Sequence, residues 1–192
     1  MSAALSRMTE RWIAEVRNGV DGVKPRFIKT GVNSAPLHEL DRKVVEAGAI
    51  CALETGLAMA CHTSGGGPAA EQTIEILLAR KLPLDKYVWV HAQNEKNNQY
   101  FERAARAGAW VSFDGLNAKS HARHWDAYFY MLNAGLLQRT LFSHDSGWYR
   151  VGEPGGGQFN GYTYIYEQFL QPVAPEFREL LLVTNPARAF GA

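Results

Sequence analysis

The sequence has few cysteines, no long hydrophobic run and no excess of charge of one sign. Cys51 and Cys61 are the only cysteines in 192 residues, too few for the disulfide framework of a small secreted domain. The longest mainly apolar stretch, residues 47–61, contains Glu54 and is too short to span a bilayer. The N-terminus lacks the apolar core of a signal peptide. We therefore expect a reduced, cytoplasmic protein with no membrane partner.

The balance of charge and the missing motifs argue against several other classes of protein. The chain carries 20 Lys+Arg against 19 Asp+Glu, a net charge of +1, which leaves no footprint for nucleic acid. Its 46% of hydrophobic residues exclude disorder as the main state. It contains no GxSxG elbow, no GxxxxGK[ST] loop and no dinucleotide-binding order of glycines. No Pro/Gly/Ser-rich linker divides it, so residues 1–192 are interpreted as a single domain.

The chain does contain a regular alternation of helix-like and strand-like segments. Helices are predicted at residues 6–18, 37–56, 69–80, 95–107 and 121–134, with a short last helix opening at 184–188. Strands are predicted at residues 25–30, 57–63, 87–92, 109–114 and 140–145. This alternation predicts an α/β fold of parallel units joined by crossover helices.

Each predicted strand ends in or near a polar residue that a buried strand should avoid. These residues are Lys29, His62, His91, Asp114 and Asp145, spaced 23 to 33 residues apart. In parallel α/β folds the carboxyl ends of the strands share one face, where active sites are built. Imidazole and carboxylate groups that converge there predict a metal or acid–base site.

Each of these residues also has a purely structural interpretation. A single histidine at a strand end is more often hydrogen-bonded than metal-bound, but a pair on neighbouring strands favours ligation by His62 and His91. Lys29 could extend to solvent along an apolar surface, and Asp145 could cap the following loop. The case for Asp114 is weaker, because an Asp-Gly pair is also an ordinary turn start.

The remaining histidines and a late aromatic cluster are assigned structural roles. His144 should point away from the side that Asp145 faces, and should pack rather than ligate. His121 and His124 lie on a predicted helix, where we expect a solvated face. The aromatic cluster is expected to form a helix packed on the core through Tyr162, Ile165, Tyr166 and Phe169.

Five short motifs follow one another along the chain: FIK, CHT, VHAQNEKN, FSHDSGW and LLVTNPARAF. In this order they resemble the phosphotriesterase family of metal-dependent amidohydrolases. The lead-in TERWIAEVRNGVDGVKPRFIK resembles the segment that feeds the fourth barrel strand of that family. The resemblance implies a (β/α)8 TIM barrel, two divalent metals, usually zinc, and hydrolysis of phosphotriesters, lactones or other esters.

The resemblance also assigns roles to four residues. Lys29 matches the strand-4 lysine that is carboxylated and bridges the metals, and a lysine desolvated at a strand end can react with CO2 in this way. His62 and His91 match the ligands of the more exposed metal. Asp145 matches the strand-8 aspartate, which binds the more buried metal and accepts a proton from the bridging hydroxide.

The sequence departs from the family pattern at two points. It contains no H-x-H pair, which strand 1 of the family contributes to the buried metal. Gly115 follows Asp114, where the family often has an arginine. Strands 4 to 8 would occupy residues 25–145, so we expect the C-terminal part of a TIM barrel with its N-terminal strands missing.

The favoured hypothesis is a metal-dependent hydrolase of a small-molecule ester, lactone or phosphotriester. One alternative is a truncated, non-catalytic barrel remnant or binding module, and another is an amidohydrolase that acts on cyclic amides or adenine. An open barrel would expose the edges of its first and last strands. We therefore expect a homo-oligomer that covers these edges, or poor solubility.

Overall fold

A computed structural model describes residues 3–191 of the chain. The strands are β1 (Ile28–Val32), β2 (Met59–Thr63), β3 (Tyr87–Val90), β4 (Trp110–Phe113) and β5 (Thr140–Phe142). The helices are α1 (Ala3–Asn18), α2 (Glu39–Thr55), α3 (Gly66–Ala79), α4 (Gln99–Arg106), α5 (His121–Asn133), α6 (Pro175–Glu179) and α7 (Asn185–Phe190). No helix within residues 3–191 is long and apolar enough to cross a membrane.

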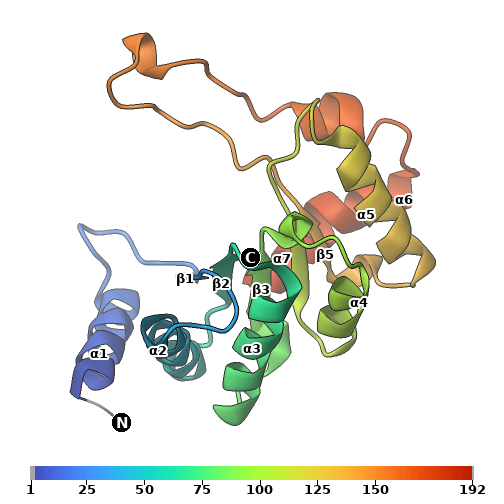
Figure 1. Cartoon of the computed structure of the whole chain (residues 1–192). Helices are drawn as coiled ribbons and strands as arrows, with labels where there is room; N and C mark the ends of the chain where they lie inside the picture. The colour runs from blue at the N-terminus through green and yellow to red at the C-terminus, as the bar shows by residue number, and fades with distance from the viewer. Residues whose placement is uncertain (1–2, 192) are drawn as a thin grey trace.

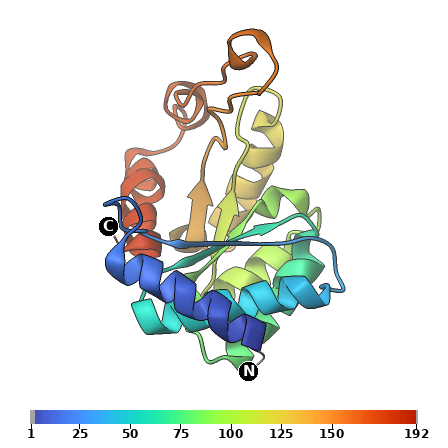
Figure 2. The ribbon, with the colours of Figure 1, turned by 90° about the vertical axis from the view of Figure 1, so that its left-hand side faces the viewer.

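The five strands form one parallel sheet in the order β1-β2-β3-β4-β5. Sequence order and spatial order therefore coincide, and helices α2, α3, α4 and α5 each connect two neighbouring strands. Figures 1 and 2 show these helices along one side of the sheet. The predicted α/β class and the parallel units are thus present.

The two faces of the sheet are buried in different ways, because side chains alternate along each strand. Trp89 belongs to the large core beneath the connecting helices, whereas its neighbour Val88 belongs to a smaller cluster on the opposite face. Ala189 of α7 lies in that smaller cluster, and Phe190 packs against it. Full burial of a phenylalanine side chain such as Phe113, which lies in the large core, stabilises the fold by about 1.5–3 kcal/mol.

Helix α4 begins four residues later than the sequence predicts. The carboxylate of Glu95 accepts the backbone N–H groups of Lys96 and Asn97, which holds the chain in a turn at the predicted helix start. The same carboxylate accepts the N–H of Gly67 at a distance of 2.7 Å. One side chain therefore closes the loop before α4 and binds the first turn of α3.

Strands β1 and β5 are shifted from their predicted positions. Pairing of β1 begins at Ile28, whose N–H donates to Ala58, so Lys29 is the second residue of its strand rather than the last. Strand β5 ends at Phe142, and Asp145 lies three residues beyond it. Side-chain polarity alone does not reveal either boundary, because backbone pairing decides it.

The segment after β5 is less regular than the sequence predicts. Residues 145–163 extend outward from the sheet, and Figure 1 shows this segment projecting beyond the rest of the molecule. The predicted helix is reduced to a single wide turn, Ile165–Phe169. Ile165 and Phe169 are buried as expected, whereas Tyr162 and Tyr166 are more than half exposed. The expectation that all four residues pack on the core is therefore half correct.

Candidate metal and acid–base site

One cavity of about 690 Å³ lies along the face of the sheet opposite the connecting helices and reaches the carboxyl ends of the strands. Its lining includes all five polar residues that follow or end the predicted strands: Lys29, His62, His91, Asp114 and Asp145. The apolar part of its wall includes Phe27, Val90, Leu141, Trp148 and Phe190. Each of the five strands, or the loop that follows it, thus contributes a polar residue to one cavity, as the parallel topology requires.

Lys29 and His62 come from the adjacent strands β1 and β2, where Lys29 pairs with Ala60 and His62 pairs with Gly31. Both side chains are exposed. The desolvation expected for Lys29 is therefore not supplied by the described residues. Nε2 of His62 lies 2.8 Å from Oγ of Ser64.

The imidazoles of His62 and His91 lie edge to face, with their ring centroids 4.3 Å apart. Partial burial lowers the pKa of His62 below its usual value of 6.5, and the nearby His91 and Lys29 lower it further. His62 is therefore neutral at neutral pH. A neutral imidazole is the form that offers a nitrogen lone pair to a metal ion.

His91 follows β3 directly and adopts a left-handed backbone conformation, with φ 63° and ψ 36°. This conformation is uncommon for residues other than glycine. The backbone N–H of His91 donates to Oδ2 of Asp114 at 2.8 Å, and its ring Nδ1 contacts Oδ1 of the same carboxylate. Asp114 therefore binds His91 through both its main chain and its side chain.

Asp114 is an organising residue of the site and not an ordinary turn start, which corrects the weaker interpretation of the sequence. Its side chain is 3% exposed. Nε2 of Gln93 donates to Oδ1 of Asp114 at 2.8 Å, while the N–H of Asp114 donates to Oε1 of Gln93 at 3.0 Å. Two features of the sequence could have identified Asp114. It follows the apolar strand WVSF directly, and the pair QN begins two residues after His91, which follows the preceding strand.

His121 and His124 do not lie on a solvated helix face, so that expectation is wrong. His124 is 1% exposed, and its ring nitrogens lie 2.9 Å and 2.8 Å from the carbonyl oxygens of Ser120 and Asp114. His121 is half-buried and contacts the hydroxyl of Tyr164 at 2.9 Å. Residues distant in sequence cover this end of α5, and the helical periodicity does not reveal them.

His144 and Asp145, the second and third residues after β5, have contrasting roles. His144 is buried, and its Nε2 accepts the N–H of Ile165 at 3.0 Å, which agrees with the predicted packing role. Asp145 is exposed and has a left-handed backbone with φ 46°. The backbone carbonyl of Asp145 accepts the indole N–H of Trp148 at 2.9 Å, so its carboxylate is not used in this contact.

The donor set fits a divalent metal ion. One potential ligand atom each from His91, Asp114 and Asp145 lies within 4.8 Å of the others. His62 and Lys29 line the same cavity. Imidazole nitrogens together with carboxylate oxygens are the ligands that zinc prefers in hydrolytic sites.

Comparison with known proteins identifies relatives of the whole chain. The sequence model described as "Phosphotriesterase family" matches residues 1–190. A curated protein from Escherichia coli (strain K12), named phosphotriesterase homology protein, is 24% identical over 203 residues, which cover 97% of this chain and 67% of that protein.

Solved structures share the fold. A lactonase from Listeria monocytogenes matches with a TM-score of 0.85 and 25% identity, over 98% of this chain and 61% of its own. The organophosphorus hydrolase from Deinococcus radiodurans matches with a TM-score of 0.86 and 23% identity, over 99% of this chain and 63% of its own. The chain thus spans roughly three fifths to two thirds of the length of these relatives. These likenesses confirm the predicted α/β class, with a parallel sheet like that of phosphotriesterase-type TIM barrels.

Proposed function

We propose, from the premise that the chain belongs to the phosphotriesterase family, that it is a single-domain metal-dependent hydrolase. The proposed metal-binding residues are Lys29, His62, His91 and Asp145. The observation that carries the proposal is that these four residues, from four different β/α units, line one cavity of about 690 Å³. Cavities of this size accommodate small-molecule substrates.

The proposed substrate is a small ester, lactone or phosphotriester with apolar substituents. The aromatic side chains of Phe27, Trp148 and Phe190 supply part of the apolar lining of the cavity. The lactonase and the organophosphorus hydrolase among the structural relatives support this substrate class. The free cysteines, Cys51 and Cys61, support a reducing, cytoplasmic location.

The chain's own residues divide the chemistry among them. Divalent ions, which we expect to be zinc and two per complete site, supply Lewis acidity toward the C=O or P=O group and acidify water. His62 and His91 hold imidazole nitrogens toward the cavity. The Lys29 ammonium would first lose one proton to solvent. The resulting amine would then form a C–N bond with CO2 and release a second proton to solvent, so that an anionic carbamate would replace a cation. The exposed carboxylate of Asp145 would accept a proton from the attacking water. As the ester bond breaks, that proton would pass to the departing alkoxide oxygen, which leaves as an alcohol.

Metal analysis and turnover test this proposal together. Protein purified without chelator should contain about one to two zinc ions per chain and should hydrolyse a member of a panel that holds a chromogenic ester, a lactone and a phosphotriester. Dialysis against a chelator should abolish turnover, and added zinc should restore it. Lys29→Ala, His62→Ala, His91→Ala and Asp145→Asn should each lower kcat/KM by at least about 100-fold.

His38→Ala is the matched control, because His38 is an exposed histidine that caps α2 outside the cavity. This variant should keep its zinc and its turnover. A folded wild-type chain that binds no metal and hydrolyses no member of the panel would favour the non-catalytic binding module instead.

A further inference from the structure

We propose that Asp114 is a positioning residue that holds His91 in one tautomer and one orientation, with Nδ1 protonated and Nε2 presented to the cavity. The inference deepens the proposed function and rests on it, since it assigns the atom through which His91 would bind metal. No relative or motif discussed above gives Asp114 this role. The hydrogen bonds of Asp114, its burial and the backbone conformation of His91 support this role.

The carboxylate of Asp114 contacts three nitrogen atoms. Oδ2 accepts the backbone N–H of His91, and Oδ1 accepts the side-chain amide of Gln93 and contacts Nδ1 of His91. Only 3% of the residue is exposed, although Asp114 is part of the cavity lining. A carboxylate in this state orients its neighbours, although its oxygens lie close to the potential ligand atoms of His91 and Asp145.

The contact with the carboxylate decides which nitrogen of His91 carries the proton. A carboxylate only accepts hydrogen bonds, so Nδ1 must be the donor, and in the neutral imidazole Nε2 then carries the lone pair. Within residues 3–191, Nε2 of His91 has no hydrogen-bond partner. The ring lines the cavity, so this lone pair is the one available to a metal ion.

The backbone of His91 depends on the same carboxylate. The left-handed turn at His91 directs both its N–H and its ring toward Asp114. Loss of the Asp114 carboxylate would therefore free the main-chain turn and the ring of His91 at the same time. The two hydrogen bonds define one arrangement of a residue that would otherwise have several rotamers.

Asp114 is itself held from two sides. The side chain of Gln93 exchanges a donor and an acceptor with it, which also fixes the orientation of the Gln93 amide. The ring of His124, from α5, contacts its carbonyl oxygen at 2.8 Å. The chain segments after β3 and β4 are thereby tied to α5 around one buried carboxylate, a rigid support for a ligand.

Nuclear magnetic resonance of the metal-free protein tests the assignment directly. Long-range proton–nitrogen correlation spectra of histidine-labelled protein, recorded where imidazoles are neutral, should show His91 as the Nδ1–H tautomer. Asp114→Asn should reverse this, because an amide whose oxygen accepts the N–H of His91 turns its NH2 group toward Nδ1. The proton must then move to Nε2.

Zinc affinity provides a second, independent measurement. Asp114→Asn should weaken zinc binding, measured by competition with a chromophoric chelator, by about 10- to 100-fold. Asp126→Asn is the matched control, because Asp126 is an exposed aspartate on α5, and it should change neither the tautomer nor the affinity. An unchanged tautomer and affinity in a folded Asp114→Asn protein would overturn the inference.

The two proposals fail in different ways. An Nε2–H tautomer in the wild-type protein would refute the positioning role, whatever the protein hydrolyses. The predicted Nδ1–H tautomer in a protein that binds no zinc would support the positioning of His91 and refute the metal-dependent hydrolase. If Asp114→Asn does not fold, the wild-type tautomer decides the inference by itself.

Discussion

Burial separates the polar residues of the cavity into two groups with different roles. Lys29, His62 and Asp145 are exposed and can reach a small molecule or an ion, whereas Asp114 is buried and held by hydrogen bonds. His91 lies between these groups, with its side chain 15% exposed. An exposed carboxylate can exchange protons with solvent, while a buried one with several donors keeps its geometry. At the scale of the residue, this difference distinguishes the group proposed for proton transfer from the group proposed for positioning.

The two cysteines provide a residue-scale test of the core. Cys51 and Cys61 are buried and free, and burial raises the pKa of both thiols, so thiolate is scarce at neutral pH. We expect a chromogenic disulfide reagent to label neither thiol readily in the native chain and both thiols in denaturant. Rapid labelling of the native protein, with unchanged circular dichroism, would contradict this burial.

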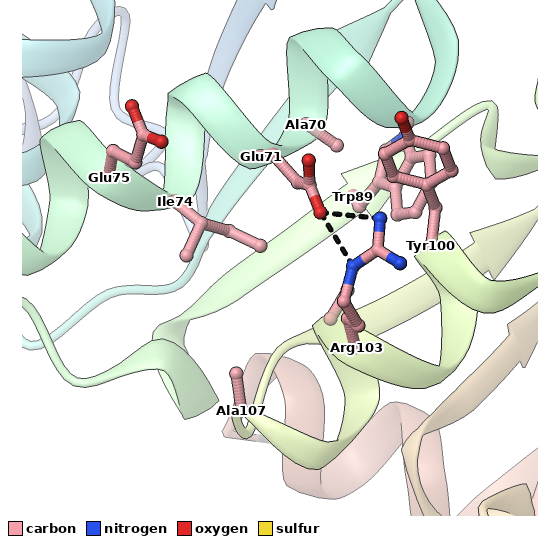
Figure 3. Close-up of a pocket in the computed structure, with 10 residues that line it drawn as sticks. Ala70, Glu71, Ile74, Glu75, Trp89, Tyr100, Arg103 and Ala107 are labelled. Atoms are coloured by element: carbon pink, nitrogen blue, oxygen red, sulfur yellow. Dashed lines mark hydrogen bonds and ion pairs between the residues drawn. The ribbon is translucent and has the colours of Figure 1, made fainter.

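At the scale of elements, helices α3 and α4 illustrate which contacts hold the outer layer. Figure 3 shows Arg103 between Glu71 and the ring of Tyr100 in a shallow pocket of about 340 Å³. The Arg103–Glu71 ion pair is 2.7 Å long, but both side chains are more than 40% exposed, so it contributes at most about 1 kcal/mol. The close approach of Tyr100 to Gly67 matters more. A Cβ atom on Gly67 would lie 2.1 Å from the ring of Tyr100.

The packing of Tyr100 on Gly67 predicts that Gly67→Ala changes the free energy of unfolding differently with and without the tyrosine ring. Gly67→Ala should lower the free energy of unfolding by about 1–3 kcal/mol, because the ring must move. In a Tyr100→Ala background the same substitution should be neutral or should stabilise, since alanine is the better helix former by about 1 kcal/mol. Urea unfolding of the four proteins measures both effects. An equal cost in both backgrounds would show that the ring contact is not the cause.

At the scale of the whole molecule, the sheet is open at both sides. Strands β1 and β5 each have one neighbour, and within residues 3–191 no other strand pairs with their outer edges. Unpaired backbone groups on a sheet edge favour pairing with another chain. Figures 1 and 2 also show the segment after β5 standing away from the body, and it carries the exposed side chains of Tyr149, Val151 and Phe159.

Open edges lead us to expect self-association. In size-exclusion chromatography with light scattering, the protein should elute as a species heavier than one chain. A variant with Tyr149→Ser and Phe159→Ser should still associate, because the edges of β1 and β5 are unchanged. A wild-type protein that stays monomeric at every concentration tested, or an association lost in this variant, would contradict edge pairing.

The sequence by itself determined the order and type of the elements as far as β5 and the polar residues that line the cavity. Both follow from local rules, since the periodicity of apolar side chains predicts a helix or a strand, and the ends of parallel strands share one face. Lys29, His62, His91 and Asp145 were therefore identifiable before their positions in space were known.

Only the tertiary structure decided the role of Asp114, the burial of His124 and the ends of β1 and β5. Gln93 and His91 are 21 and 23 residues away from Asp114, and only folding brings their N–H groups to its carboxylate. The burial of a side chain depends on the elements that cover it, and a strand ends where its neighbour stops pairing. Periodicity within a segment contains neither kind of information, because both depend on partners distant in the chain.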